Sequence, residues 1–139
     1  MSLDPASLPR FSVVRIPYRF TNATNDEIKR FVILGHQAGH VICIKATTKV
    51  DVYKNSPEKM AGCVFYKANE VKFFETETAI QPDNPFPIPH AHIIACASAS
   101  NLQILGNLPS DFCDKLKLAI EISCTLSKER KYNLIELIK

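Results

Sequence analysis

Three short apolar runs near the start of the chain, separated only by polar turns, limit the folds that this sequence can adopt. They lie at residues 11–16, 31–34 and 41–44. Short runs of β-branched and aromatic residues bounded by turn residues are typical of strands rather than helices. The turn at residues 35–39 is short enough to pair the second and third runs as an antiparallel hairpin. The order therefore predicts an antiparallel sheet, not the alternating strands and helices of a parallel one.

The rest of the chain continues this pattern and ends in helices. Further strands are expected at residues 61–66, 71–74, 76–80, 90–96 and 102–105, and a surface loop at 48–59. Four prolines between Pro82 and Pro89 cannot donate ladder hydrogen bonds, so this segment is expected as extended surface chain. Ser110 or Asp111 is a candidate N-cap for an amphipathic helix of about four turns, and a second helix is expected from Ser127.

The length and composition fit one globular domain. A chain of 139 residues with 46% hydrophobic and 22% charged residues can bury its own core. Residues 1–10 contain two prolines and no periodicity, so we expect a flexible N-terminal arm before a single domain at 11–139. No apolar run approaches the ~20 residues of a membrane helix, and the start lacks a secretory signal pattern. We therefore expect a cytoplasmic protein without membrane contact.

Cysteine, glycine and histidine usage argues against several kinds of site. The five cysteines are odd in number and include no CxxC pair, which indicates reduced thiols rather than a disulfide framework or zinc ribbon. Four separate glycines cannot build a phosphate loop or a dinucleotide fingerprint. His36 and His40 flank the hairpin turn, and His90 and His92 are expected on a strand. We expect no metal site and no cofactor.

Positive charge is concentrated in the first third of the chain. The net charge is only +3. Residues 1–50 nevertheless contain seven lysines and arginines against three acidic residues, whereas residues 51–100 contain four against six. A basic segment can attract a phosphate backbone, although a mildly basic surface without a ligand would have the same composition.

Arg30 and Thr47 form the most suggestive pair of polar residues. Each lies at the end of a hairpin strand opposite the turn, where antiparallel neighbours approach each other. RNA cleavage through the 2′-hydroxyl needs charge stabilisation on the phosphorane, which the fixed fork of an arginine supplies. A threonine hydroxyl can hold a phosphate oxygen or orient the 2′-hydroxyl. Neighbouring basic and aromatic residues could add affinity for single-stranded RNA: Arg19, Lys29, Lys45, Lys49 and Tyr18.

The order of these segments resembles the MazF/PemK toxins, small ribonucleases of bacterial toxin–antitoxin pairs. Residues 30–36 lie over the family's second strand, which begins at an arginine, and residues 44–49 lie over its third strand with a threonine motif. Residues 79–83 resemble a family strand that contains a glutamine, and residues 104–108 resemble the segment before its last helix. The likeness spans roughly residues 11–126.

This resemblance implies a fold and a function. The fold is a small antiparallel SH3-like β-barrel of the MazF/PemK/CcdB toxin type, closed by one or two C-terminal helices. The function is that of a metal-independent endoribonuclease of a type II toxin–antitoxin system, with Arg30 and Thr47 in the catalytic arginine and threonine positions. The resemblance further implies a homodimer and a cognate antitoxin protein whose disordered tail occupies the RNA groove.

Three positions differ from the family pattern. Phe11-Ser12 replaces a Gly-Asp pair, Phe31 replaces a proline, and Ile80 replaces an acidic residue of some members. The last difference leaves general-base chemistry without an obvious carboxylate, unless Asp83 or a histidine takes that role. Two alternatives stay open. One is a non-catalytic member of the same fold, acting as a binding module or a gyrase-type toxin. The other is an unrelated β-rich protein whose Arg30 and Thr47 are ordinary surface residues.

Overall fold

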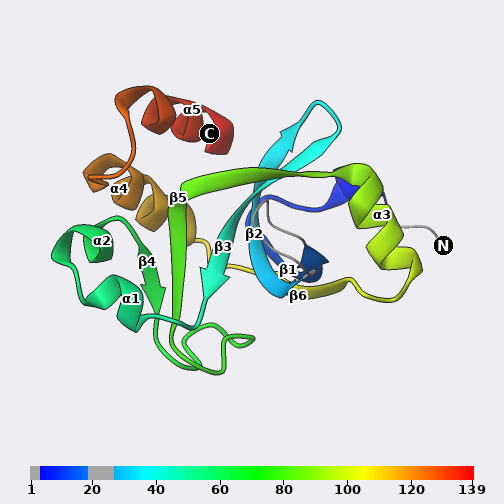
Figure 1. Ribbon diagram of the computed structural model, residues 1–139, viewed down its shortest axis with the longest axis horizontal. Helices are drawn as coiled ribbons and strands as arrows, with labels where there is room; N and C mark the ends of the chain where they lie inside the picture. The colour runs from blue at the N-terminus through cyan, green and yellow to red at the C-terminus, as the bar shows by residue number, and fades with distance from the viewer. Residues whose placement is uncertain (1–3, 19–26) are drawn as a thin grey trace.

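The computed structural model describes residues 4–18 and 27–139, and its centre is one six-stranded antiparallel sheet (Figure 1). The strands are β1 (Ser12–Tyr18), β2 (Glu27–Gln37), β3 (His40–Thr47), β4 (Val64–Tyr66), β5 (Thr78–Pro89) and β6 (Gln103–Asn107). Their order across the sheet is β4-β5-β3-β2-β1-β6. The helices are α1 (Asp51–Lys54), α2 (Pro57–Ala61), α3 (His90–Ser98), α4 (Phe112–Ile122) and α5 (Lys128–Ile138). The predicted hairpin, the strands around residues 64 and 103, and both C-terminal helices are confirmed.

The sheet is not closed into a barrel, so the predicted SH3-like closure is wrong. Among the described residues, β4 and β6 are the outer strands and do not pair with each other. Two features explain the opening. β4 has only three residues, and the expected strand at residues 71–74 forms turns instead. Side chains of that turn segment lie between the two edges, because the Phe73 ring lies against Gly106 of β6 and the Phe74 ring packs on Tyr66 of β4.

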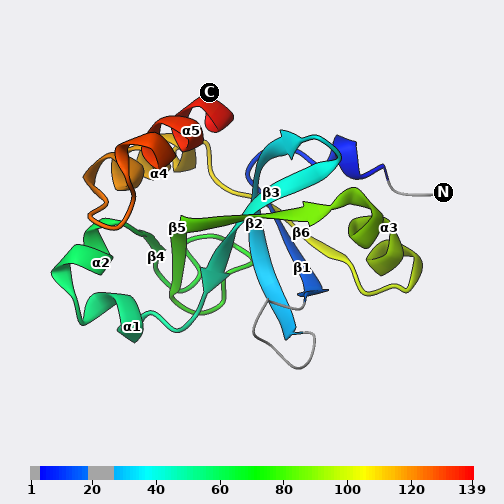
Figure 2. The same cartoon turned by 45° about the horizontal axis from the view of Figure 1, so that its top comes forward.

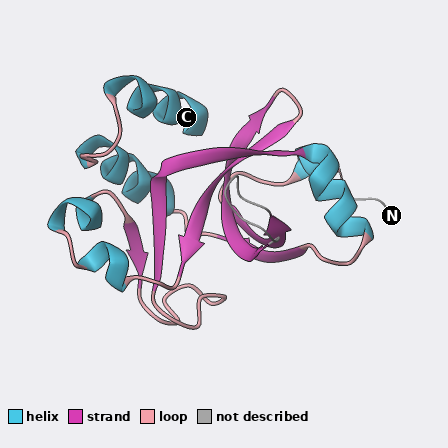
Figure 3. Ribbon diagram, in the orientation of Figure 1, coloured by secondary structure: helices cyan, strands magenta, loops and turns pink. Residues whose placement is uncertain are grey.

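Two apolar cores lie on opposite faces of the sheet, as the alternation of side chains along β2 requires. Val32 and Leu34 belong to the core that includes residues of α4 and α5, whereas Phe31 and Ile33 belong to the core that includes α3. Figures 2 and 3 show α4 and α5 together on one side of the molecule and α3 at the far end of β5. The alternating burial of one strand thus gives two buried layers.

The proline segment is part of β5, where the sequence predicted unpaired surface chain. From Phe86 to Pro89 it pairs with β3, with Cys43 opposite Phe86 and His40 opposite Pro89. The pairing shifts between Gln81 and Phe86, where four residues of β5 stand opposite one residue of β3. β4 reaches only Thr78–Ile80 of β5. The prolines therefore lie on a stretch with a free edge, where a missing N–H breaks no ladder.

Two further segments correct the sequence-based expectation. The segment at 90–96, predicted as a strand, is helix α3, with Ile93 and Cys96 buried at helical spacing and Ile94 exposed. The alternation of histidine and alanine at residues 90–92 suggested the two-residue period of a strand. The expected loop at 48–59 contains α1 and α2. Helix α2 has a capping serine, since Ser56 Oγ accepts from the Lys59 amide and proline occupies the first turn.

The segment before β1, where the sequence suggested a flexible arm, contacts the domain in its described part. Leu8 is buried in the core that includes α3. Arg10 Nε donates to the Leu34 carbonyl at 3.1 Å and Nη1 donates to the Lys139 carbonyl at 2.7 Å. These bonds connect the beginning of the described chain to β2 and to the end of α5. Within the described residues, no helix has the length and apolar character needed to cross a membrane.

Candidate functional site

The β2–β3 hairpin brings Arg30 and Thr47 to the same end of the sheet, as the sequence predicted. Arg30 pairs with Ala46, one residue before Thr47, and the turn at the other end joins Gln37 to His40. Thr47 also pairs with Ala79 of β5. On its other side, Arg30 stands opposite Arg15 of β1. Like charges directly opposite each other are unfavourable, so this end of the sheet favours an anion nearby.

Arg30 and Thr47 nevertheless start from opposite faces of the sheet. Arg30 shares a face with its partner Ala46, and Thr47 is one position further along β3. Lys45 shares the face of Thr47, because it lies two residues before it on the same strand. Any joint action of Arg30 and Thr47 therefore takes place at the end of the sheet, where side chains from both faces meet.

A hollow of about 260 Å³ lies at this end of the sheet and unites most of the predicted site. We call it the basic hollow. It is lined by Lys29, Arg30, Lys45, Ala46, Thr47, Lys49, Val52 and Tyr53. Four of these side chains are cations, and no carboxylate from the described part of the chain is among them. A concave surface lined with positive charges concentrates anionic ligands.

The Thr47 hydroxyl is held in place by the backbone that follows β3. Its Oγ1 accepts a hydrogen bond of 3.1 Å from the Lys49 amide. That bond uses one acceptor position and leaves the hydroxyl proton to donate. Thr47 can therefore donate to a phosphate oxygen while the chain fixes its position.

The two remaining predicted RNA-binding residues do not line the basic hollow. Tyr18 is half-buried, and its ring packs with those of Phe31, Phe86 and His92, with centroids 5.5 to 6.2 Å apart. It lies beside the α3 core. Arg19 lies outside the described residues.

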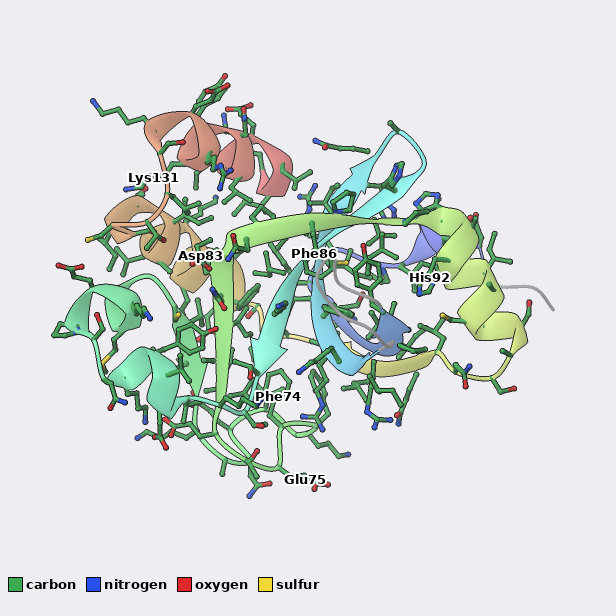
Figure 4. The ribbon with its side chains drawn as sticks, in the orientation of Figure 1. Phe74, Glu75, Asp83, Phe86, His92 and Lys131 are labelled. Carbon is green, nitrogen blue, oxygen red and sulfur yellow. The ribbon has the colours of Figure 1, made fainter. Side chains whose placement is uncertain are left out.

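The histidines lie away from the basic hollow and bond to other parts of the fold. His36 Nε2 is 2.9 Å from the Leu8 carbonyl, and His36 Nδ1 is 3.2 Å from His90 Nε2. His92 Nε2 is 2.8 Å from the Pro17 carbonyl. Figure 4 shows His92 on α3, at the far side of the sheet from α1 and α2. Throughout the described ranges, no three His, Cys, Asp or Glu side chains come together as a metal site.

A second hollow of about 240 Å³ adjoins the first, and the sequence did not reveal it. We call it the mixed hollow because it contains both charges. It is lined by Val52, Tyr53, Glu58, Lys59, Gly62, Cys63, Gln81, Asp83 and Thr125. Val52 and Tyr53 of α1 line both hollows. The Tyr53 hydroxyl donates to Gln81 Oε1, so a bond between α1 and β5 lies where the two hollows meet.

Burial and negative charge in the mixed hollow suppress the ionisation of the Cys63 thiol and the Tyr53 hydroxyl. Burial raises the pKa of the Cys63 thiol to about 11, and the nearby Asp83 carboxylate adds to this effect. Burial also raises the pKa of Tyr53, with smaller contributions from Cys63 and Asp83. A negative charge disfavours a second one nearby. Both groups therefore stay protonated at neutral pH, and Asp83 supplies the negative charge beside them.

Comparison of the sequence with protein-family models and with curated proteins gave no match. The two hollows and the residues that line them are therefore the features of the fold that bear on function.

Proposed function

We propose that this protein is a metal-independent endoribonuclease toxin of a type II toxin–antitoxin system, and that the basic hollow binds the phosphate at which single-stranded RNA is cut. One observation supports this most strongly. Five residues named from the sequence for catalysis or RNA binding, from two separate segments, line a single hollow: Lys29, Arg30, Lys45, Thr47 and Lys49. The resemblance to the MazF/PemK toxins assigns the same two positions, Arg30 and Thr47, to catalysis.

The proposed reaction is an in-line displacement at phosphorus. The 2′-oxygen forms a bond to phosphorus, the bond to the 5′-oxygen breaks, and the products carry a 2′,3′-cyclic phosphate and a 5′-hydroxyl. Arg30 donates two hydrogen bonds to the phosphorane oxygens, whose charge increases in the transition state. Thr47 donates a third. The 2′-hydroxyl proton passes to water, and a lysine ammonium or water protonates the leaving 5′-oxygen.

A cytoplasmic location, a homodimer and a cognate antitoxin belong to the same proposal. The resemblance supports all three. The cations of the basic hollow also suit an acidic antitoxin tail, which would compete with the RNA backbone for the same charges. Such an antitoxin would inhibit the protein by occupying the hollow.

A second candidate function is RNA binding without cleavage. The observation that favours it is the composition of the basic hollow, since no carboxylate of the described chain lines it to accept the 2′-hydroxyl proton. In that case the same cations and Thr47 would bind the backbone, and the protein would act as a binding module of the same fold.

The test is cleavage of a long single-stranded RNA by purified protein in EDTA. The variant is Arg30→Ala, and the matched control is Arg130→Ala, which removes an exposed arginine of α5. We expect discrete fragments with 5′-hydroxyl ends from the wild type and from Arg130→Ala. Arg30→Ala should be slower by about 100-fold or more, as for loss of one transition-state donor. Equal cleavage by Arg30→Ala would contradict the proposal, and tight binding without cleavage would support the second candidate.

A further inference from the structure

Asp83 is the unusual residue of the mixed hollow. Its Oδ1 atom is inaccessible to solvent and has no hydrogen-bond partner among the residues that the structure describes. Figure 4 shows Asp83 at the bend of β5, within the stretch where β5 departs from its pairing with β3. A carboxylate oxygen that is buried without a donor is unfavourable, because the lost hydration is not replaced. A ligand that brings N–H donors into the hollow would remove this defect when the carboxylate turns toward it.

Gln81 brings a hydrogen-bond donor to the same hollow. Its Oε1 accepts from the Tyr53 hydroxyl, which leaves the amide nitrogen to donate. Gln81 and Asp83 are two residues apart on β5, and both line the mixed hollow. Asp83 as a whole is only partly buried, and rotation about its soft χ2 torsion would turn both carboxylate oxygens toward a ligand. The hollow would then offer one N–H donor and a carboxylate with two acceptor oxygens. A complementary ligand has one acceptor next to two donors.

We infer that the mixed hollow is a nucleobase subsite and that it selects guanine. The guanine edge presents the O6 acceptor, the N1–H donor and the N2 amino donor in that order. O6 would accept from the Gln81 amide, and the two donors would bond to the Asp83 carboxylate. Adenine and cytosine each present one amino donor beside an acceptor, and uracil presents one N–H between two acceptors. Only guanine offers both donors to the carboxylate.

The size and position of the hollow agree with one base. Its volume of about 240 Å³ is below the ~300–1,000 Å³ of pockets that hold drug-sized ligands. The basic hollow adjoins it, since Val52 and Tyr53 line both hollows. A phosphate bound at the cations and a base bound at Asp83 would thus belong to the same stretch of RNA. This inference rests on the proposed function, because it takes the occupant of the basic hollow to be an RNA phosphate.

The first test uses mononucleotides, so that it does not depend on cleavage. Binding of the four ribonucleoside monophosphates and of inosine monophosphate is measured for the wild type, Asp83→Asn and Asp114→Asn by titration to millimolar concentration. Asp114→Asn makes the same change on an exposed residue of α4. Inosine has the guanine edge without the 2-amino group, so it tests the carboxylate contact even if a variant fails to fold.

We expect the wild type and Asp114→Asn to bind guanosine monophosphate at least roughly tenfold more tightly than the other three natural nucleotides, as a good bidentate contact gives. Inosine monophosphate should bind several-fold more weakly than guanosine monophosphate. Asp83→Asn should lose the preference, because its amide replaces one acceptor by a donor. Equal binding of all nucleotides, no binding at all, or an unchanged preference in Asp83→Asn would overturn the inference.

Mapping of cleavage sites separates this inference from the proposed function. Cleavage next to guanine, with that bias lost in Asp83→Asn, would support both. Cleavage without any dependence on guanine would overturn the subsite and leave the ribonuclease standing. A guanine preference in the nucleotide titration with no RNA cleavage would support the subsite and contradict the ribonuclease.

Discussion

The two hollows that meet at Tyr53 have similar volumes but different charged groups. The basic hollow, of about 260 Å³, contains four cationic side chains and, within the described chain, no acidic one. The mixed hollow, of about 240 Å³, contains Asp83 and Glu58 against Lys59. A site of the first kind can neutralise a phosphate, whereas a site of the second kind can accept hydrogen bonds from a base. The comparison teaches that one short helix, α1, can separate two environments suited to two parts of a nucleotide.

The largest expected difference between the hollows concerns the cleavage rate, because the proposed catalytic residues line only the basic hollow. Thr47→Val removes a hydroxyl from the basic hollow and keeps the side-chain shape. We expect a loss of cleavage rate of about 100-fold, the size found for removal of one transition-state donor. Thr47→Ser should recover most of the rate, since it restores the hydroxyl. The rates are measured on one defined RNA in EDTA.

The control for this variant is Thr48→Val, which makes the same change on the exposed neighbouring residue. It should cleave at the wild-type rate. If Thr47→Val cleaves as fast as Thr48→Val, the hydroxyl has no part in the reaction, and the assignment of Thr47 is wrong.

A smaller difference is expected in the salt dependence of RNA binding. Each lysine that neutralises a phosphate releases about 0.7 counterion from a single strand. Lys45→Ala should therefore reduce the slope of log K against log salt by roughly 0.7 and weaken binding several-fold at moderate salt. Lys59→Ala, in the mixed hollow, should leave the slope nearly unchanged. Binding of a non-cleavable oligonucleotide over a salt series measures both, and equal slopes for the two variants would remove the distinction between the hollows.

The smallest effect is the response of Cys63 to its acidic neighbour. Burial and the Asp83 charge raise the pKa of this thiol to about 11 from 9.0. Asp83→Asn removes the negative charge that opposes the thiolate, so the pKa of Cys63 should fall and its alkylation should begin at lower pH. Peptide-resolved mass spectrometry follows the rate against pH, with Asp114→Asn as the control. A profile that moves to higher pH, or equally in both variants, would contradict the proximity of Asp83 to Cys63.

The features that the sequence predicted correctly are those that depend on short stretches of neighbouring residues. The hairpin of β2 and β3 follows from two apolar runs around a tight turn, and α4 and α5 follow from apolar residues at helical spacing. Because the hairpin fixes the position of Arg30 beside Ala46 and Thr47, the basic hollow could be anticipated in its main residues. The predicted position of Arg30 and Thr47 opposite the turn was enough to place both at one end of the sheet.

Features that depend on distant segments could not be predicted in this way. Closure of the sheet depends on whether β4 and β6 meet, and the short β4 with the Phe73 side chain beside Gly106 leaves them apart. The mixed hollow combines α1, α2, β5 and Thr125, which share no motif. The prolines before Phe86 suggested unpaired chain, although they form the bend of β5 that carries Asp83. The prolines were visible in the sequence, but whether their segment pairs depends on β3, which lies beside it.

The most direct test of the central claim is to locate bound RNA on the protein. Backbone amide shifts are recorded by NMR while a 2′-O-methyl oligonucleotide, which cannot be cleaved, is added. We expect the largest changes at residues 29–30, 45–49 and 52–53, and smaller ones at 81–83. Changes concentrated at the hairpin turn and α3, with residues 45–49 unaffected, would contradict the account.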